Sequence, residues 1–159
     1  MNLRLDPLEV SDAAEMVGVL SDPALYAVTG GEPPTLDELT ERYRRQVVGR
    51  SADGREEWLN WVVRVDDVAV GFVQATVSDE RRASIAWVIG LAWQGRGYAT
   101  AAVSAMVAEL RMRGVIDVRA SIAPGHEASE RVASRIGLAA TEQVDEDGER
   151  LWVVPQAPR

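Results

Sequence analysis

The feature that most constrains the fold is a change of hydrophobic period part-way along the chain. Trp58–Val65 and Val68–Val77 are rich in Val and Trp and are separated only by Asp66-Asp67, which predicts a β-hairpin. Ser78–Arg81 is a second polar turn, and Ser84–Ile89 is expected to form a third strand. Three consecutive strands joined by short turns predict an antiparallel meander.

Helical periodicity precedes the meander. Ser11 or Asp12 is expected to open a first helix, with Ala13, Met16, Val17 and Leu20 on one face. Thr35 and Glu38 have the spacing of a capping box, which predicts the start of a second helix that stops near Gly49. The residues expected on its inner side are Leu36, Leu39, Tyr43 and Val47.

The remaining segments complete an α+β pattern. A short edge strand is expected at Leu3–Leu5, and the elements after the meander are a helix following Gly95–Gly97, a strand at Val115–Ile122, a helix at Glu127–Ile136 and a hairpin of Leu138–Val144 and Leu151–Val154. The last helix is expected to present Ala128, Val132 and Ile136 to the core. This order predicts a mixed, mostly antiparallel sheet flanked by helices. We expect one domain at 1–154 and a short tail at 155–159.

The composition narrows the classes of function that the chain can have. The chain has 159 residues and a formal net charge of -8, which argues against non-specific nucleic-acid binding and is compatible with a cationic substrate. It has no cysteine and only one histidine, His126, so we expect no metal site and no cysteine nucleophile. The N-terminus shows no apolar signal core, and no apolar run approaches the roughly 18 residues of a membrane span. We therefore expect a cytoplasmic protein that acts without a membrane.

The stretch Ile85–Ala99 carries the chemistry. A strand ends near Ile89, and Gly95-Arg96-Gly97 opens a helix. Unpaired amides at a helix N-terminus, approached closely through glycines, form a cradle for phosphate. Two other interpretations are a glycine turn without a ligand and a dinucleotide site. The dinucleotide fingerprint requires a third Gly or Ala where this chain has Thr100. It also requires an acidic residue at the end of the next strand, where this chain has none.

The same stretch resembles a known family. Gln94-Gly95-Arg96-Gly97-Tyr98-Ala99 is similar to the acetyl-CoA pyrophosphate motif of the GNAT acetyltransferases, Gln/Arg-x-x-Gly-x-Gly/Ala. His126–Leu138 resembles the family's Asn-x-x-Ser/Ala…Gly-Phe helix, and the two helices before the meander match the family's order. The likeness spans nearly the whole chain. Ala128-Ser129 and the Trp93-Gln94-Gly95 lead-in are most similar to the ribosomal-protein N-terminal acetyltransferase (Rim-like) branch.

This resemblance implies an acetyl-CoA-dependent N-acetyltransferase. Acetyl-CoA, the co-substrate, would lie between the strands that end at Ile89 and Ile122, and a primary amine would attack the thioester directly in a ternary complex. The amide of Val88 or Ile89 would stabilise the oxyanion, and the loop Leu25–Pro34 would cover the acceptor. The residues implied to bind acetyl-CoA are Trp87, Val88, Ile89, Gln94, Gly95, Arg96, Gly97, Tyr98, Ala99 and His126.

Two positions depart from the family pattern. The tyrosine that many members use as general acid is replaced by Ala133, and the positions of the usual glutamate base are Ser84 and Ser121. The remaining catalytic candidates are Ser129, which the resemblance to Rim-like members places near the leaving sulfur, and His126, a residue type that can relay a proton. Their alternatives are a helix serine bonded to backbone and a capping or solvent-facing histidine. Loop carboxylates that would act through water are Asp79, Glu80 and Glu32.

The missing tyrosine and glutamate leave a second function open, that of a non-catalytic acyl-CoA-binding sensor or scaffold. If the chain is an enzyme, its acceptor is a protein N-terminus, a small polyamine or an amine-bearing antibiotic. We expect a monomer or homodimer.

Overall fold

The structure is a computed structural model that describes residues 2–155. Its elements in chain order are β1 (Leu3–Pro7), α1 (Ala13–Val19), α2 (Leu36–Gln46), β2 (Glu56–Val65), β3 (Val68–Ser78), β4 (Arg82–Ile89), α3 (Tyr98–Met112), β5 (Asp117–Ile122), α4 (Glu127–Arg135), β6 (Ala139–Val144) and β7 (Arg150–Val153). Short 3-10 turns are η1 (Val10–Asp12), η2 (Pro23–Tyr26) and η3 (Leu91–Trp93). The predicted α+β class is confirmed. From residue 156 onward, the predicted tail lies outside the described residues.

The strands form one seven-stranded sheet in the order β1-β2-β3-β4-β5-β7-β6. β2, β3 and β4 pair antiparallel as neighbours, so the predicted meander is confirmed. Asp66 and Asp67 have φ angles of 50° and 70° and join β2 to β3. Positive φ at both central residues gives a two-residue turn whose twist matches that of the flanking strands. β7 inserts between β5 and β6, so the closing hairpin joins the sheet through its second strand.

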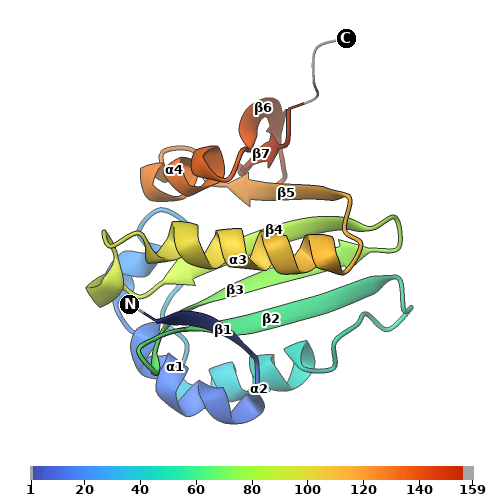
Figure 1. The fold of residues 1–159 in the computed structure, drawn as a ribbon. Helices are drawn as coiled ribbons and strands as arrows, with labels where there is room; N and C mark the ends of the chain where they lie inside the picture. The colour runs from blue at the N-terminus through green and yellow to red at the C-terminus, as the bar shows by residue number, and fades with distance from the viewer. Residues whose placement is uncertain (1, 156–159) are drawn as a thin grey trace.

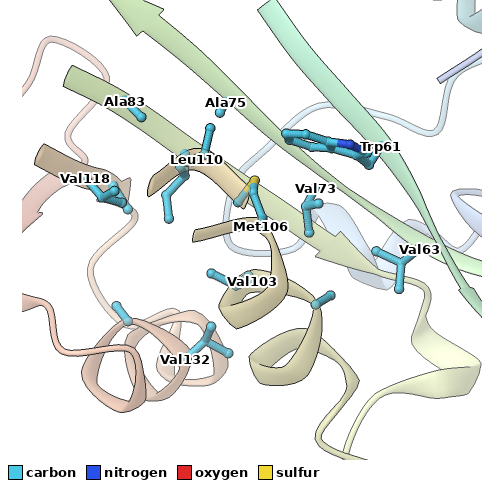
Figure 2. Packing of buried hydrophobic residues seen from close by; sticks show 14 of the residues in the cluster. Trp61, Val63, Val73, Ala75, Ala83, Val103, Met106, Leu110, Val118 and Val132 are labelled. Carbon is cyan, nitrogen blue, oxygen red and sulfur yellow. The ribbon is translucent and has the colours of Figure 1, made fainter. Parts of the chain in front are cut away.

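Helices cover the two faces of the sheet (Figure 1). On one face, the inner side of α3 packs on β2, β3 and β4; Figure 2 shows Val103, Met106 and Leu110 directed toward these strands. α1 and α2 lie against the opposite face and form a second cluster with β2 and β3. The central residues of this second cluster are Met16, Leu39, Tyr43, Val62 and Ala69. The two clusters hold the sheet between them, and fully burying a Val, Leu or Met side chain in them is worth roughly 1.5–3 kcal/mol.

The capping box of α2 is confirmed, but its predicted buried face is partly wrong. Glu38 N–H donates to Thr35 Oγ1 at 3.1 Å, and Thr35 N–H donates to Glu38 Oε1 at 3.3 Å. Leu39 and Tyr43 are buried, whereas Leu36 and Val47 are 47% and 43% exposed. Leu36 starts the helix and Val47 follows its last residue, so only the middle of α2 packs into the core.

The predicted buried face of α4 is also partly wrong. Ala128 is exposed, and the buried residues are Ser129, Val132 and Ala133. α4 contacts both α3 and β5, and it buries Ser129 and Ala133 there together with Val132, which is buried as predicted. Ser129 therefore lies on the inner side of the helix.

Candidate functional site

β4 and β5 are the only parallel neighbours in the described sheet, and they separate part-way along their length. They pair only where Arg82, Ala83 and Ser84 face Asp117, Val118 and Arg119. Beyond Ser84, β4 stays bonded to β3, and β5 stays bonded to β7, so each strand is held on its outer side alone. The inner edges therefore expose unpaired backbone groups toward each other. A cavity of about 830 Å³ lies at this opening, where the sequence predicted a ligand.

The end of β4 is held in place by two contacts. Gly90 N–H donates to the carbonyl of Val70 at 2.8 Å, and the side-chain amide of Gln94 donates to the carbonyl of Ile89 at 2.9 Å. Gly71 lies opposite Ile89, and a Cβ at Gly71 would come within 2.2 Å of the Val88 carbonyl oxygen. Only glycine permits this close approach. Gln94 thus ties the glycine loop to the strand that lines the cavity.

The N-terminus of α3 is open, unlike that of α2. Gly95 and Gly97 have φ angles of 78° and 81°, a left-handed conformation that suits glycine. Gly97 is the N-cap of α3, with no side-chain cap and no acidic residue in the first turn. α2 instead starts with a capping box and carries Asp37 in its first turn. The first amides of α3 therefore keep their partial positive charge for an external anion.

The predicted acetyl-CoA residues gather around the cavity with one exception. Arg96 is exposed and does not line it. The lining residues among those predicted are Trp87, Val88, Ile89, Gln94, Gly95, Gly97, Tyr98, Ala99 and His126. His126 is the N-cap of α4, and its side chain forms no cap hydrogen bond.

Ser129 projects from the first turn of α4 into the same cavity, and it is only 9% exposed. Among the described residues no hydrogen bond involves its hydroxyl, whereas Thr40 Oγ1 donates to the Leu36 carbonyl of its own helix at 2.7 Å. Ser129 is therefore not used as a backbone-bonded helix serine, and its hydroxyl is free to donate into the cavity. Ala133, at the position of the family's tyrosine, is fully buried in the core and does not line the cavity.

The loop carboxylates considered from sequence do not reach this cavity. Asp79, Glu80 and Glu32 do not line it, and neither does Ser84, although Ser121 does. Asp79 and Glu80 lie in the β3–β4 turn, at the opposite end of β4 from Ile89.

The one carboxylate that lines the cavity in the described part of the chain is Glu149. β7 pairs with β5 so that Arg150 faces Ile122, which brings Glu149 to the end of β5 beside the cavity. Burial raises the pKa of Glu149 above that of an ordinary glutamate, and the charges of Asp145 and Asp147 add to the effect. Sequence reasoning missed Glu149 because its position depends on β7 pairing with β5.

Three arginines at the cavity were also missed from sequence. Arg131 and Arg135 lie on α4, and Arg42 lies on α2. With Glu149 they are the charged side chains of the cavity wall within residues 2–155, so this wall is cationic in a chain of net charge -8. Nη1 of Arg131 also lies 3.9 Å from Oε2 of Glu127. Exposed helix arginines have no distinctive sequence signal, because only packing decides which of them reach a cavity.

The connection between α1 and α2 closes the remaining side. Leu25, Tyr26, Val28 and Thr29, from the loop expected to cover the acceptor, line the cavity. The Tyr26 hydroxyl donates to the carbonyl of Leu20 at 2.9 Å, which anchors this wall to α1. Burial raises the pKa of Tyr26, and the positive charge of Arg42 acts in the opposite direction.

Within residues 2–155, no helix is long and apolar enough to cross a membrane. No group of three or more His, Cys, Asp or Glu side chains in that range is arranged to hold a metal ion.

Comparisons with known proteins agree with this geometry. Residues 2–139 match the family described as Acetyltransferase (GNAT) domain. No curated protein matches the sequence. Among solved structures, an acetyltransferase from Thermus thermophilus superposes with a TM-score of 0.81 at 21% identity, over 98% of each chain.

Two further structures represent different kinds of acceptor. Aminoglycoside acetyltransferase AAC(6')-Ib in complex with coenzyme A has a TM-score of 0.80 at 17% identity, over 96% of this chain and 93% of the other. RimL, a ribosomal L7/L12 alpha-N-protein acetyltransferase in complex with coenzyme A, has a TM-score of 0.80 at 12% identity, over 96% and 93%. At these identities the structures share the fold. The similar structures thus include a member of the Rim-like branch expected from sequence, and also an acetyltransferase named for a different acceptor.

Proposed function

The chain belongs to the GNAT acetyltransferase family, and on that premise we propose that it transfers the acetyl group of acetyl-CoA to a primary amine. The observation that carries the proposal is the cavity between β4 and β5, with the open N-terminus of α3 in its wall. A cleft between two splayed strands suits an extended thioester, and the uncapped helix suits its diphosphate.

Acetyl-CoA would bind mainly through the backbone. The diphosphate would lie on the amides between Gln94 and Ala99, with Arg131 and Arg135 supplying positive charge from α4. The pantetheine amides would pair with the free edge of β4 at Trp87–Ile89, as an added strand. Binding through main-chain amides explains why the loop needs left-handed glycines rather than particular side chains.

The chemistry requires the removal of two protons from the acceptor nitrogen, one before attack and one as the tetrahedral intermediate collapses, and the stabilisation of one leaving group. An alkyl ammonium has a pKa near 10, so it must lose a proton before its lone pair attacks the thioester carbon. We assign that proton to Glu149, directly or through water. Its raised pKa makes it a stronger base than an ordinary carboxylate. General base catalysis of this kind contributes typically about 10²- to 10⁴-fold.

The C–N bond forms as the carbonyl oxygen becomes an oxyanion, which the amide of Val88 or Ile89 would stabilise. As the intermediate loses its second N–H proton to solvent, the C–S bond breaks and the electron pair leaves on the CoA sulfur as a thiolate, which takes up a proton to give the free thiol. Ser129, whose hydroxyl has no partner among the described residues, would donate a hydrogen bond to that thiolate. No covalent enzyme intermediate is needed, because proximity in the ternary complex supplies much of the acceleration.

A turnover assay tests this function. Purified protein is mixed with acetyl-CoA and a panel of amines, namely a peptide N-terminus, free amino acids, a polyamine and an aminoglycoside, and the released CoA thiol is measured. We expect amine-dependent thiol release that is lost in Glu149→Gln. CoA binding by calorimetry with no thiol release for any amine would instead support the non-catalytic sensor, which the missing tyrosine at Ala133 favours. Absence of CoA binding would reject both functions.

A further inference from the structure

The cavity has two chemically different halves. α3 and α4 lie on one side of the splayed strands and provide the open helix terminus, Arg131 and Arg135. The other half is bounded by α1, η2 and α2. Its wall is mostly apolar and includes Leu20, Leu25, Tyr26, Val28 and Phe72. Phe72 packs with the α1–α2 cluster, whereas Trp87 and Ile89 pack with the α3 cluster. If acetyl-CoA occupies the α3–α4 half, the acceptor must enter through the other.

Arg42 is the one charged side chain that the described residues contribute to the acceptor half. No ion pair or hydrogen bond within residues 2–155 involves the side chain of Arg42. Arg44, on the same helix, does form an ion pair, with its Nη1 atom 3.2 Å from Oε2 of Glu41. Arg42 lines the same part of the cavity as Tyr26, and its positive charge acts to lower the pKa of that tyrosine. Its guanidinium is therefore available to an external anion.

The acceptor half contains no carboxylate among its described residues; Glu149 enters the cavity from the β5–β7 side. The Tyr26 hydroxyl is engaged by the Leu20 carbonyl, which leaves its ring as wall. A polycation bound here would place ammonium groups beside Arg42 with no carboxylate to compensate. The overall charge of -8 is compatible with a cationic substrate, but the local charge of this half is positive.

We propose that Arg42 makes this site selective for an amine that carries a carboxylate on an apolar or aromatic body, the chemistry of a hydrophobic amino acid or short peptide. A guanidinium binds a carboxylate through two parallel hydrogen bonds, and such charge-assisted bonds are about twice as strong as neutral ones. The apolar wall holds the hydrophobic body, and the amine is left facing the thioester and Glu149. This inference rests on the proposed acetyl transfer and adds the class of acceptor to it.

The test compares acceptors that differ only in the carboxylate. kcat/KM is measured for L-phenylalanine against 2-phenylethylamine, and for the dipeptide Phe-Gly against its C-terminal amide, with spermidine as the polycation. The first pair tests a free amino acid and the second a peptide. We expect at least one carboxylate acceptor to exceed its neutral partner by 10-fold or more, and spermidine to be the poorest substrate.

Variants of α2 then assign the preference to one residue. Arg42→Ala is expected to raise KM for the carboxylate acceptor by 10-fold or more, with kcat and the KM of the neutral partner changed less than 2-fold. Arg42→Glu should invert the preference toward spermidine. Arg45→Ala is the matched control, because Arg45 lies on the same helix, is exposed and does not line the cavity. It should behave as the wild type.

The outcomes separate this inference from the function beneath it. If acetyl-CoA binds and amines are acetylated, but neither pair discriminates, the acceptor class is wrong and the acetyltransferase stands. Discrimination that survives in Arg42→Ala would likewise overturn the role of Arg42. If no amine releases CoA thiol, the proposed function fails, and this inference fails with it.

Discussion

Gly97 allows the phosphate cradle to be tested with a single side chain. Its φ of 81° is left-handed, and a Cβ added there would meet no atom within 4 Å. A non-glycine residue therefore fits without a clash, but it takes on the cost of the left-handed conformation, about 1–2 kcal/mol. In a domain of this size that cost lowers Tm by roughly 2–8 °C. Gly97→Asn and Gly97→Asp should both show this lower Tm, since the two side chains are nearly equal in volume.

Only the aspartate adds a negative charge. If its carboxylate lies about 6 Å from a phosphate, Coulomb repulsion is roughly 0.7 kcal/mol in water and roughly 3 kcal/mol at an effective dielectric constant of 20. CoA affinity should therefore fall by about 3- to 150-fold relative to Gly97→Asn. The aspartate is not expected to gain much as a helix cap, because N-cap side chains reach the first amides from an extended backbone and not from a left-handed one.

Calorimetric titration of CoA into wild type, Gly97→Asn and Gly97→Asp measures this difference, and a melting curve for each checks that it is folded. The asparagine variant controls for backbone strain and side-chain volume. If the two folded variants bind CoA with the same affinity, no phosphate lies at the N-terminus of α3, and the cradle must be abandoned.

The remaining predictions concern proton transfer and burial. Ser129→Ala should lower kcat by roughly 10- to 100-fold with little change in CoA affinity, as steady-state kinetics and calorimetry would show; an unchanged kcat would remove Ser129 from the mechanism. Glu149→Gln should lower kcat about 100-fold or more and abolish the loss of rate as pH falls through the raised pKa of Glu149; a variant that keeps this acid limb would place the base elsewhere. His126→Ala should lower kcat if His126 relays the amine proton, and an unchanged kcat would leave it as a helix N-cap. Burial raises the pKa of Tyr43 to about 12, and its buried hydroxyl has no hydrogen-bond partner within residues 2–155. The unfolded state therefore releases this proton first, near pH 10, so stability should fall by roughly 2–3 kcal/mol as pH rises toward 12. Tyr43→Phe should be as stable as the wild type at pH 7 and should lack this alkaline loss in urea titrations.

Short-range patterns explain which parts of the fold were predictable. Thr35 and Glu38 specify the start of α2 because their side chains and amides are only three residues apart. Asp66-Asp67 specifies a tight turn for the same reason, and it fixes β2 and β3 as neighbours. The glycine pair at Gly95 and Gly97 marks the open helix start through its backbone conformation alone.

The errors in the helices arose where burial depends on the partner surface. The helical spacing of the apolar residues in α2 was predicted correctly, yet Leu36 is exposed. The spacing of apolar residues identifies one side of a helix, but it does not show along how much of that side another element packs. On α4 the apolar pattern favoured Ala128, and packing against α3 and β5 buried Ser129 instead. Ser129 thus lines the cavity beside Ala128 and Val132, the two residues of the predicted apolar face that also reach it.

By itself, the sequence determined the order of the elements, the meander, the glycine loop before α3 and the family likeness, because each depends on residues that are neighbours in the chain. Tertiary structure alone decided which charges meet at the cavity. Arg42 lies on α2 and Glu149 lies beside β7, far apart in the sequence. They reach one cavity only because α2 packs on the face of the sheet formed by β2 and β3, and because β7, not β6, is the strand that pairs with β5. Contacts between distant segments leave no periodic pattern in either segment, so the proposed base and the proposed acceptor-side cation could be identified only from the tertiary structure.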